Sequence, residues 1–200
     1  MRTRAVPITP STQPFLQATA RMASATAGWQ NLTDDQRAAW KAYTQTHPVF
    51  NALGQSVTLS GHQAYVGITC RLDLASTSAI TDPPTIAQPE ALDSITVTYD
   101  IGAGTSTIAY TTTPLAANHH LWVLCAVTSS PGVEYVKNLY KLIHVSAAAL
   151  ASPYDWESDA VARFGTIVVG QKVHFMVMQF SAVTGLLSAP RIASGVVVST

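Results

Sequence analysis

The densest group of potential ligand atoms in the sequence is an acidic cluster around a tryptophan. Asp155, Glu157 and Asp159 flank Trp156 at alternating positions. Carboxylates at this spacing can bind calcium from a loop or act as an acid–base pair. The cluster lacks the central glycine and the distal glutamate of a calcium-binding loop. We therefore expect a solvated loop with a helical turn and no metal ion.

The same loop offers a second kind of chemistry. Tyr154 and Trp156 are two aromatic residues beside Asp155, and aromatic rings with polar edges suit a partly wet contact such as a sugar. Tyr154, Asp155 and Trp156 are therefore a candidate ligand loop, with carbohydrate as the possible ligand.

Histidines form the other chemically capable group. His119 and His120 are adjacent, and on a strand adjacent side chains point to opposite faces, so the pair cannot hold one metal ion without a bend. One of them could meet His144 or His174 if strands brought these positions together. We expect surface or interface histidines instead.

No sequence motif for catalysis or cofactor binding is present. The chain lacks the nucleophile elbow, the phosphate-binding loop, the dinucleotide fingerprint and the His-Glu-x-x-His pattern. Cys70 and Cys125 belong to no CxxC or Cys/His zinc pattern, and we expect two buried free thiols. The sequence thus predicts no catalytic residue, cofactor or metal, and we expect the protein not to be an enzyme.

The chain carries little charge. Charged residues make up 11% of the sequence, with 11 basic and 11 acidic side chains, against roughly 25% charged residues in an ordinary soluble domain. A balanced charge and the absence of a basic run argue against a nucleic-acid partner. Few ions must be desolvated when a neighbour packs on such a surface, which favours assembly. A merely neutral soluble domain is the alternative.

The first part of the chain is expected to be helical. Residues 1–13 contain two prolines and no periodicity, which predicts an extended arm. Residues 14–75 form the predicted helical segment. Its helices should span residues 15–27, with Gly28 as the stop, then residues 33–46 and 60–74. Capping boxes at Thr33–Gln36 and Ser60–Gln63 begin the last two. Residues 76–91, rich in Ser, Thr and Pro, read as a semi-rigid linker.

In residues 92–200 the spacing of apolar residues changes to the two-residue period of β-strands. The apolar run 121–127 does not alternate, which predicts a central strand covered on both faces. Short strands separated by turn signals indicate a sandwich or a barrel. The strand candidates are 95–99, 107–112, 121–127, 139–146, 161–169, 173–181 and 190–198.

The final part of this domain resembles a fibronectin type III domain. Residues 169–190 combine a turn, a long alternating strand, a Gly-bearing loop and Ser-Ala-Pro before the last strand. Val173, Phe175 and Val177 should point to one side of that strand, and Trp122 is a candidate for the core tryptophan. The resemblance implies an immunoglobulin- or fibronectin III-like β-sandwich, so the expected fold class is α+β, a small N-terminal helical segment followed by an all-β sandwich.

The helical segment carries a second resemblance. A Trp-bearing helix at 32–40, an Asn-x-x-Gly turn at 51–54, a Ser-Gly-x-x-x-Tyr helix at 60–65 and the pair Pro83-Pro84 are similar to uncharacterised proteins of tailed bacteriophages. This resemblance implies a structural component of a virus particle, in the capsid or the tail.

Size leads to the same expectation. About three helices are too few to bury a convincing core alone, so their apolar faces should cover other surfaces. The predicted function is therefore a structural subunit of a virion, whose partners are other copies of itself and other particle proteins. The alternative is a binding or adhesion module that recognises carbohydrate or a cell surface. The predicted assembly contacts are Phe15, Leu16, Trp29, Trp40, Tyr43 and Tyr65.

The sequence also predicts where the protein is located. The N-terminus lacks the apolar stretch of a secretory signal, and nothing approaches ~20 consecutive apolar residues. We expect no membrane partner and assembly of the particle in the cytoplasm of the host.

Overall fold

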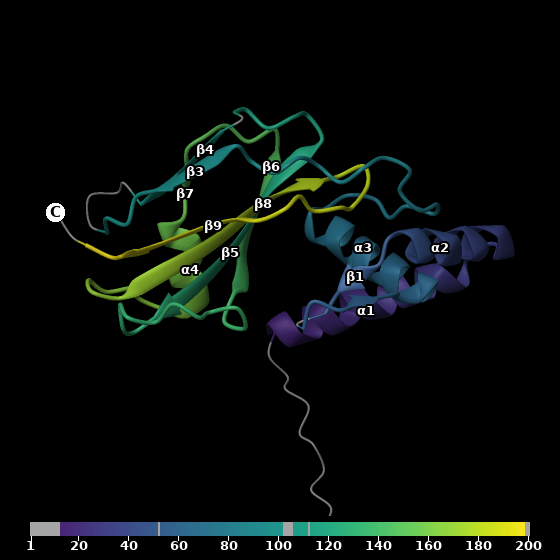
Figure 1. The fold of residues 1–200 in the computed structure, drawn as a ribbon, viewed down its shortest axis with the longest axis horizontal. Coiled ribbons are helices and arrows are strands. Elements are labelled where there is room, and N and C mark those ends of the chain that lie inside the picture. The colour runs from purple at the N-terminus through teal and green to yellow at the C-terminus, as the bar shows by residue number, and fades with distance from the viewer. Residues whose placement is uncertain (1–12, 52, 102–105, 112, 199–200) are drawn as a thin grey trace, which may run out of the picture. The chain divides into compact units, whose positions relative to one another are not determined.

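Figure 1 shows the computed structural model of the chain, which describes residues 13–51, 53–101, 106–111 and 113–198. The fold contains helices and antiparallel sheets, as an α+β class requires. It divides into two compact units. The helical unit comprises the residues up to Asp73 together with Ser78–Pro83, and the β unit comprises Leu74–Thr77 and Pro84–Thr200. Nearly all of the predicted arm, residues 1–12, lies outside the described residues.

Three helices build the helical unit: α1 (Gln13–Gln30), α2 (Asp34–Thr46) and α3 (Gly61–Leu74). Both predicted capping boxes are present. Thr33 Oγ1 accepts from the Gln36 amide while the Gln36 side chain accepts from the Thr33 amide. Ser60 and Gln63 make the same reciprocal pair at the start of α3. These local hydrogen bonds satisfy amides that would otherwise lack partners at the helix ends.

Gly28 does not stop the first helix, contrary to the sequence prediction, because α1 continues through Trp29 to Gln30. The glycine serves a close approach of two helices. A Cβ atom at this position would lie 2.7 Å from the Tyr65 hydroxyl of α3. Gly61 permits a close approach of α3 to α2 in the same way, since a Cβ atom there would lie 3.0 Å from the Lys41 backbone nitrogen of α2.

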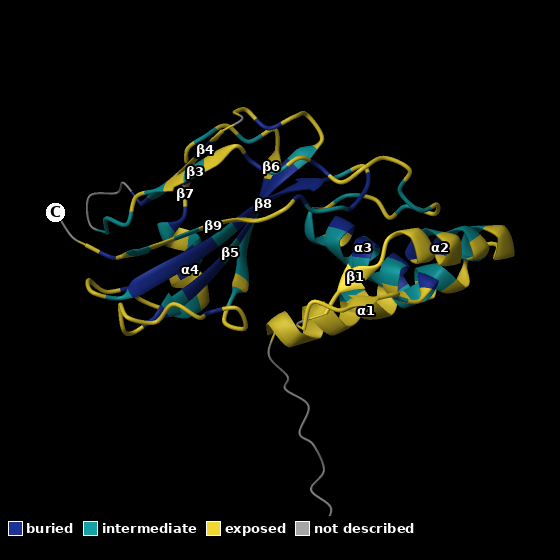
Figure 2. Ribbon diagram, in the orientation of Figure 1, coloured by how far each residue is buried: buried dark blue, intermediate teal, exposed yellow. Residues whose placement is uncertain are grey.

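The core of the helical unit forms where these helices meet (Figure 2). Trp40 is 0% exposed and Tyr65 is 3% exposed, and their rings meet edge-on at 5.4 Å. The indole Nε1 of Trp40 donates to the carbonyl of Thr81 at 2.8 Å, within the same unit. Leu72 and Ile68 complete this interior. The prediction that Trp40 and Tyr65 are assembly contacts is therefore wrong, because neither ring reaches the surface.

A small hairpin of β1 (Val49–Phe50) and β2 (Ser56–Val57) joins α2 to α3. Its turn is held by Asn51, whose Oδ1 accepts from the amides of Leu53 and Gln55. Leu53 is 83% exposed. The sequence indicated a turn here but not the paired strands.

The β unit contains two antiparallel sheets with the orders β3-β4-β7 and β6-β5-β8-β9. The strands are β3 (Ser94–Val97), β4 (Thr107–Thr111), β5 (His119–Thr128), β6 (Lys141–Ala148), β7 (Tyr154–Asp155), β8 (Lys172–Ser181) and β9 (Arg191–Val196). β5 lies inside its sheet and is mostly buried along its length, which confirms the central strand predicted from the run 121–127.

Residues of both sheets share one core. Ile108 and Tyr110 of β4 belong to it, together with Val123 of β5 and Phe175 of β8. The inward direction predicted for Val173, Phe175 and Val177 is confirmed by their burial in this core. The core tryptophan is Trp156, because strand alternation turns Trp122 to the other face, where it packs against Phe180.

The predicted strand 161–169 is wrong. Residues Glu157–Phe164 form the helix α4, which lies beside the sheet in Figure 1. Trp156, Ala160 and Phe164 recur every four residues, which is helical spacing, and all three pack into or against the core. Two acidic residues in the first turn also suit the positive end of the helix dipole.

The segment 76–91, expected to be a linker, is divided between the units. Ser78–Pro83 groups with the helices, where Thr81 accepts the Trp40 indole, and the residues from Pro84 on group with the β unit.

Alanine substitutions at two glycines of α3 should change the stability of the protein in opposite directions. Gly61→Ala should destabilise the protein by about 1–3 kcal/mol, because the new methyl group meets backbone atoms that cannot move freely. Gly67→Ala, in the same helix, should be neutral or stabilise by up to about 1 kcal/mol, because its Cβ has room and alanine favours helix. Urea unfolding followed by circular dichroism measures both. Equal effects at the two positions would contradict the close approach at Gly61.

Candidate functional site

The predicted ligand loop is not available to a ligand. Trp156 is 0% exposed and Tyr154 is 7% exposed. The Trp156 ring packs on Phe175 at 5.0 Å between centroids, and its Nε1 donates to the Thr98 carbonyl at 3.1 Å. Asp155 is exposed, but no aromatic face beside it is open to a sugar. The prediction of a carbohydrate-stacking site at Tyr154, Asp155 and Trp156 is therefore wrong, because both rings belong to the core.

The acidic side chains of this region serve separate partners. Asp159 accepts from the Tyr154 hydroxyl at 2.5 Å and pairs with His144 Nδ1 at 2.8 Å. Glu157 instead accepts from Ser106 Oγ at 2.9 Å. Burial, reinforced by the hydrogen bond to Asp159, raises the pKa of Tyr154. Asp159 thus links β7, α4 and β6, which is a structural role.

The histidines are likewise dispersed. His119 Nδ1 lies 3.0 Å from Gln179 Oε1, and His120 Nδ1 lies 2.7 Å from the Ser146 carbonyl. His174 is buried on β8. Within the described parts of the chain, no three His, Cys, Asp or Glu side chains gather closely enough to hold a metal ion.

Both cysteines are free, as predicted. Cys125 is buried in the β unit, where burial raises the pKa of its thiol to about 12. Cys70 lies in the helical unit and is only partly buried, so the expectation that both thiols are buried is wrong for Cys70. A thiol that stays protonated is a poor nucleophile and metal ligand, so Cys125 acts as a core residue.

The helical unit has an exposed apolar surface along α1, in addition to the tip of the β1–β2 hairpin. Every residue from Gln13 to Ala20 is exposed, Leu16 is 47% exposed and Met22 is 59% exposed. Arg21 is the one charged residue of this 18-residue helix, and it bonds Asp73 at 2.7 Å. A shallow hollow of about 510 Å³ runs along the helix. We call this surface the α1 face: Leu16, Thr19, Met22, Ala23, Thr26, Ala27 and Gln30.

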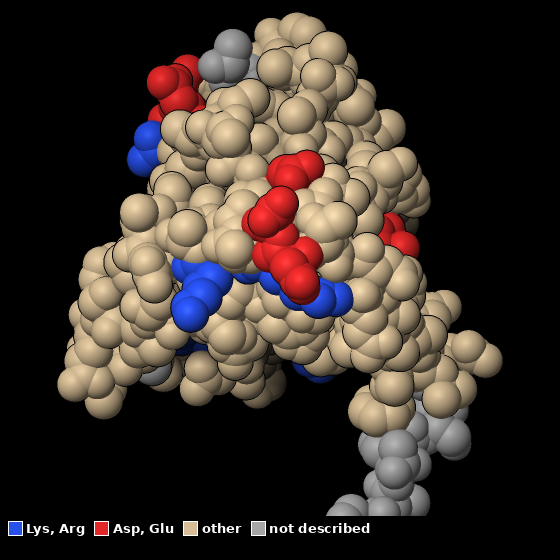
Figure 3. All heavy atoms as spheres, turned by 90° about the vertical axis from the view of Figure 1, so that its right-hand side faces the viewer, with Lys and Arg blue, Asp and Glu red and all other residues tan. Residues whose placement is uncertain are grey.

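The predicted assembly contacts therefore divide into two groups. Phe15 and Leu16 are exposed, whereas Trp29 and Tyr43 are half-buried and Trp40 and Tyr65 are interior. Sequence reasoning did not single out Met22, although its helical spacing from Thr19 and Thr26 could have indicated a shared face. In the view of Figure 3, charged side chains are few and most of the visible surface is uncharged.

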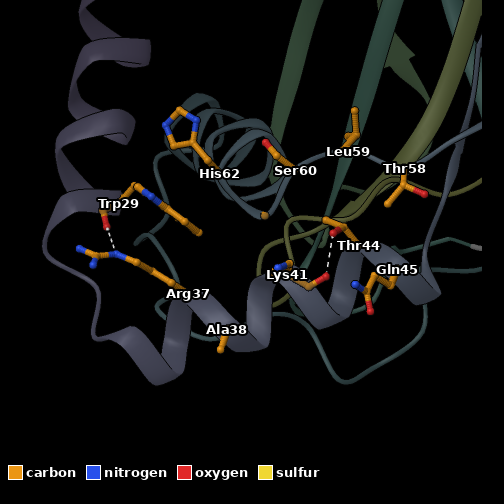
Figure 4. A pocket seen from close by; sticks show the side chains of 11 residues that line it. Trp29, Arg37, Ala38, Lys41, Thr44, Gln45, Thr58, Leu59, Ser60 and His62 are labelled. Carbon is orange, nitrogen blue, oxygen red and sulfur yellow. Dashed lines mark hydrogen bonds between the residues drawn. The ribbon is translucent and has the colours of Figure 1, made fainter.

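A second hollow lies where α1, α2 and the start of α3 meet (Figure 4). We call it the helical pocket; its volume is about 510 Å³. Trp29 and His62 form an aromatic end, with ring centroids 5.5 Å apart and nearly perpendicular rings. The remaining lining residues are Arg37, Ala38, Lys41, Thr44, Gln45, Thr58, Leu59, Ser60 and Gly61.

Arg37 holds the helical pocket together. Its Nη2 donates to the Gln30 carbonyl at 2.8 Å and its Nε to the Trp29 carbonyl at 3.5 Å, and its Nη1 pairs with Asp34 at 3.0 Å. Arg37 therefore closes the last turn of α1, where carbonyls lack helical partners. Because these bonds occupy its guanidinium, the pocket is a largely apolar hollow and not a strong anion site.

Comparison with known proteins gives little. No protein-family model matches the chain, and no curated protein matches it. One solved structure, described as the crystal structure of a Fn3-like protein from Clostridium thermocellum, is 14% identical. The match covers 57% of this chain and 96% of that chain, with a TM-score of 0.33. The sheet order and the shared core of the two sheets define the architecture of the β unit.

The helices do not provide a membrane span: none within the described residues combines the necessary length and apolarity.

The buried histidine of β8 makes a pH dependence testable. Burial, and then the charge of Lys172, lower the pKa of His174 below its ordinary value of 6.5. Between these two pKa values the unfolded chain binds more protons than the folded one. The contribution of His174 is therefore complete above about pH 6.5 and is lost as the pH falls toward the folded pKa.

Urea midpoints measured from neutral to mildly acidic pH should accordingly fall, and His174→Gln should flatten the profile. The wild-type protein measured in the same series of buffers is the control. An unchanged slope in His174→Gln would contradict the assignment.

Proposed function

We propose that the protein is a structural subunit of a virus particle that works through protein–protein contacts, and that the α1 face is its main contact. The observation that supports this proposal is an uncharged helix face left open on a unit that already has its own core. The particle context is supported by the resemblance of the helical segment to proteins of tailed bacteriophages.

The exposure of α1 argues for a partner on physical grounds. Short helices are marginal in water unless packing covers one face. Only Ala25 of α1 is buried, and the first two turns have every residue exposed. A partner that covered Leu16 and Met22 would remove apolar surface from water without desolvating an ion.

A second copy of α1 fits this face. Leu16, Thr19, Ala23, Thr26 and Gln30 follow one another at alternating intervals of three and four residues, which is the spacing of a two-helix seam. Alanine and threonine at the seam permit a close approach of the two helices. Because the face has no charge of its own, two copies can pair about a two-fold axis without repulsion.

We further infer that the β unit is a fibronectin III-like sandwich. Two antiparallel sheets with a shared core have the architecture of that group, and the resemblance of residues 169–190 agrees with it. Such a sandwich would be a second compact body of the subunit, while the helical unit carries the α1 face.

Self-association tests this proposal. The wild-type protein should form dimers or larger assemblies, and Ala23→Glu should weaken association at least about tenfold, because it buries an unpaired charge in the seam. Sedimentation velocity over a concentration series measures the change. Ala23 is exposed, so the fold should survive the substitution.

Gln17→Glu is the control. Gln17 is also an exposed residue of α1, but it lies about 120° around the helix from Ala23 and about 140° from Met22. It should therefore associate like the wild type. A wild-type protein that stayed monomeric at high concentration, or equal effects of the two substitutions, would overturn the α1 contact.

A further inference from the structure

We infer that the helical pocket binds the segment Pro7-Ile8-Thr9-Pro10 from a neighbouring copy of the chain. This inference rests on the proposed assembly function and names a second contact in it. The segment belongs to residues 1–12, which lie outside the described part of the chain.

The pocket has the features of a proline-recognition groove. Trp29 and His62 supply aromatic surface at one end, and Ala38, Leu59 and Gly61 supply small or apolar wall. Proline-rich segments dock in grooves lined by aromatic rings, which pack against the flat proline rings. At about 510 Å³ the hollow has room for such side chains, since pockets for small ligands span roughly 300–1,000 Å³.

The segment has the matching chemistry. Pro7 and Pro10 stand three residues apart with no charged residue between them, which is the Pro-x-x-Pro pattern of polyproline ligands. Proline fixes its own φ angle and restricts the residue before it, so little conformational entropy is lost on binding. Ile8 adds an apolar side chain.

The chain length makes the contact intermolecular. Trp29 follows Gln13 by sixteen residues of helix, which places it about 24 Å away along α1. Pro10 precedes Gln13 by three residues and can extend at most about 11 Å from it, and Pro7 at most about 21 Å. Pro10 therefore cannot reach the Trp29 ring of its own chain, even with the length of the Trp29 side chain added. A Pro-x-x-Pro segment bound at the aromatic end through both prolines must come from another copy.

Charge sets the direction of the segment. Asp34 and Asp35 lie in the first turn of α2, and Asp34 is solvent-exposed beside Arg37 of the pocket. Lys41 lines the pocket one turn further along α2. Arg2 and Arg4, which precede the motif, are therefore favoured over the start of α2 and disfavoured near Lys41.

Peptide binding to the full-length protein tests the inference. The receptor is the Pro7→Ala/Pro10→Ala variant, whose own segment cannot compete, and the probe is a fluorescent peptide of residues 1–12. We expect saturable binding by fluorescence anisotropy. A peptide with both prolines replaced by alanine should bind at least about tenfold more weakly.

Two alanines of α2 provide a matched pair for the pocket. Ala38→Trp in the same receptor should fill the hollow and abolish binding, whereas Ala42→Trp should preserve it, because Ala42 is exposed and does not line the pocket. Circular dichroism and thermal unfolding should be alike for the two variants. Equal binding to both, or no preference for the prolines, would overturn the inference.

The outcomes separate this contact from the α1 contact. If the peptide fails to bind while Ala23→Glu still disrupts self-association, the inference fails and the proposed function stands. If the peptide binds in the pocket-dependent manner while Ala23→Glu has no effect, the segment contact is supported and the α1 contact is wrong.

Discussion

The packing of Tyr65 against α1 and α2 is the contact on which the helical unit depends. Gly28 lets the Tyr65 ring approach α1, and Gly61 lets the start of α3 lie directly on the backbone of α2. Trp40 fills the space between them, with its one polar atom bonded to Thr81. Because this contact lies at the C-terminal end of α1, it anchors only the last turns of that helix. Residues 13–20 lie at the other end of α1, away from this contact, and are therefore exposed.

That arrangement changes the physical basis of the assembly argument. The size of the segment indicated that its aromatic residues must be covered by a neighbour, yet Trp40 and Tyr65 are covered by their own helices. What stays open is a stripe of small and flexible side chains on α1, together with the tip of the β1–β2 hairpin. Because this stripe has no large aromatic side chain, a contact there depends on the close approach of many atoms. The proposal therefore rests on Ala23 and Met22 rather than on tryptophan.

The sequence predicted best where the cause is local. Thr33 and Ser60 begin helices because each bonds within four residues of itself, and both caps were predicted. The failures concern contacts between distant residues. Nothing near Trp156 in the sequence shows that Phe175 lies over its ring, so its burial could not be read from the loop. The run Val161 to Val169 has β-branched residues, but the packing of Ala160 and Phe164 on the core makes its first part helical. Gly28 looked like a stop because its partner, Tyr65, is far along the chain.

The two proposed contacts differ in symmetry, and this difference determines what they can build together. Pairing of α1 faces uses the same surface on both copies, so it closes after two chains. Insertion of residues 7–10 into a helical pocket joins different surfaces, so it can continue from copy to copy or close into a ring. A chain with one contact of each kind can form extended or ring-shaped arrays of dimers. Both surfaces belong to the helical unit or the residues preceding it, so the β unit would keep its own surface for further contacts.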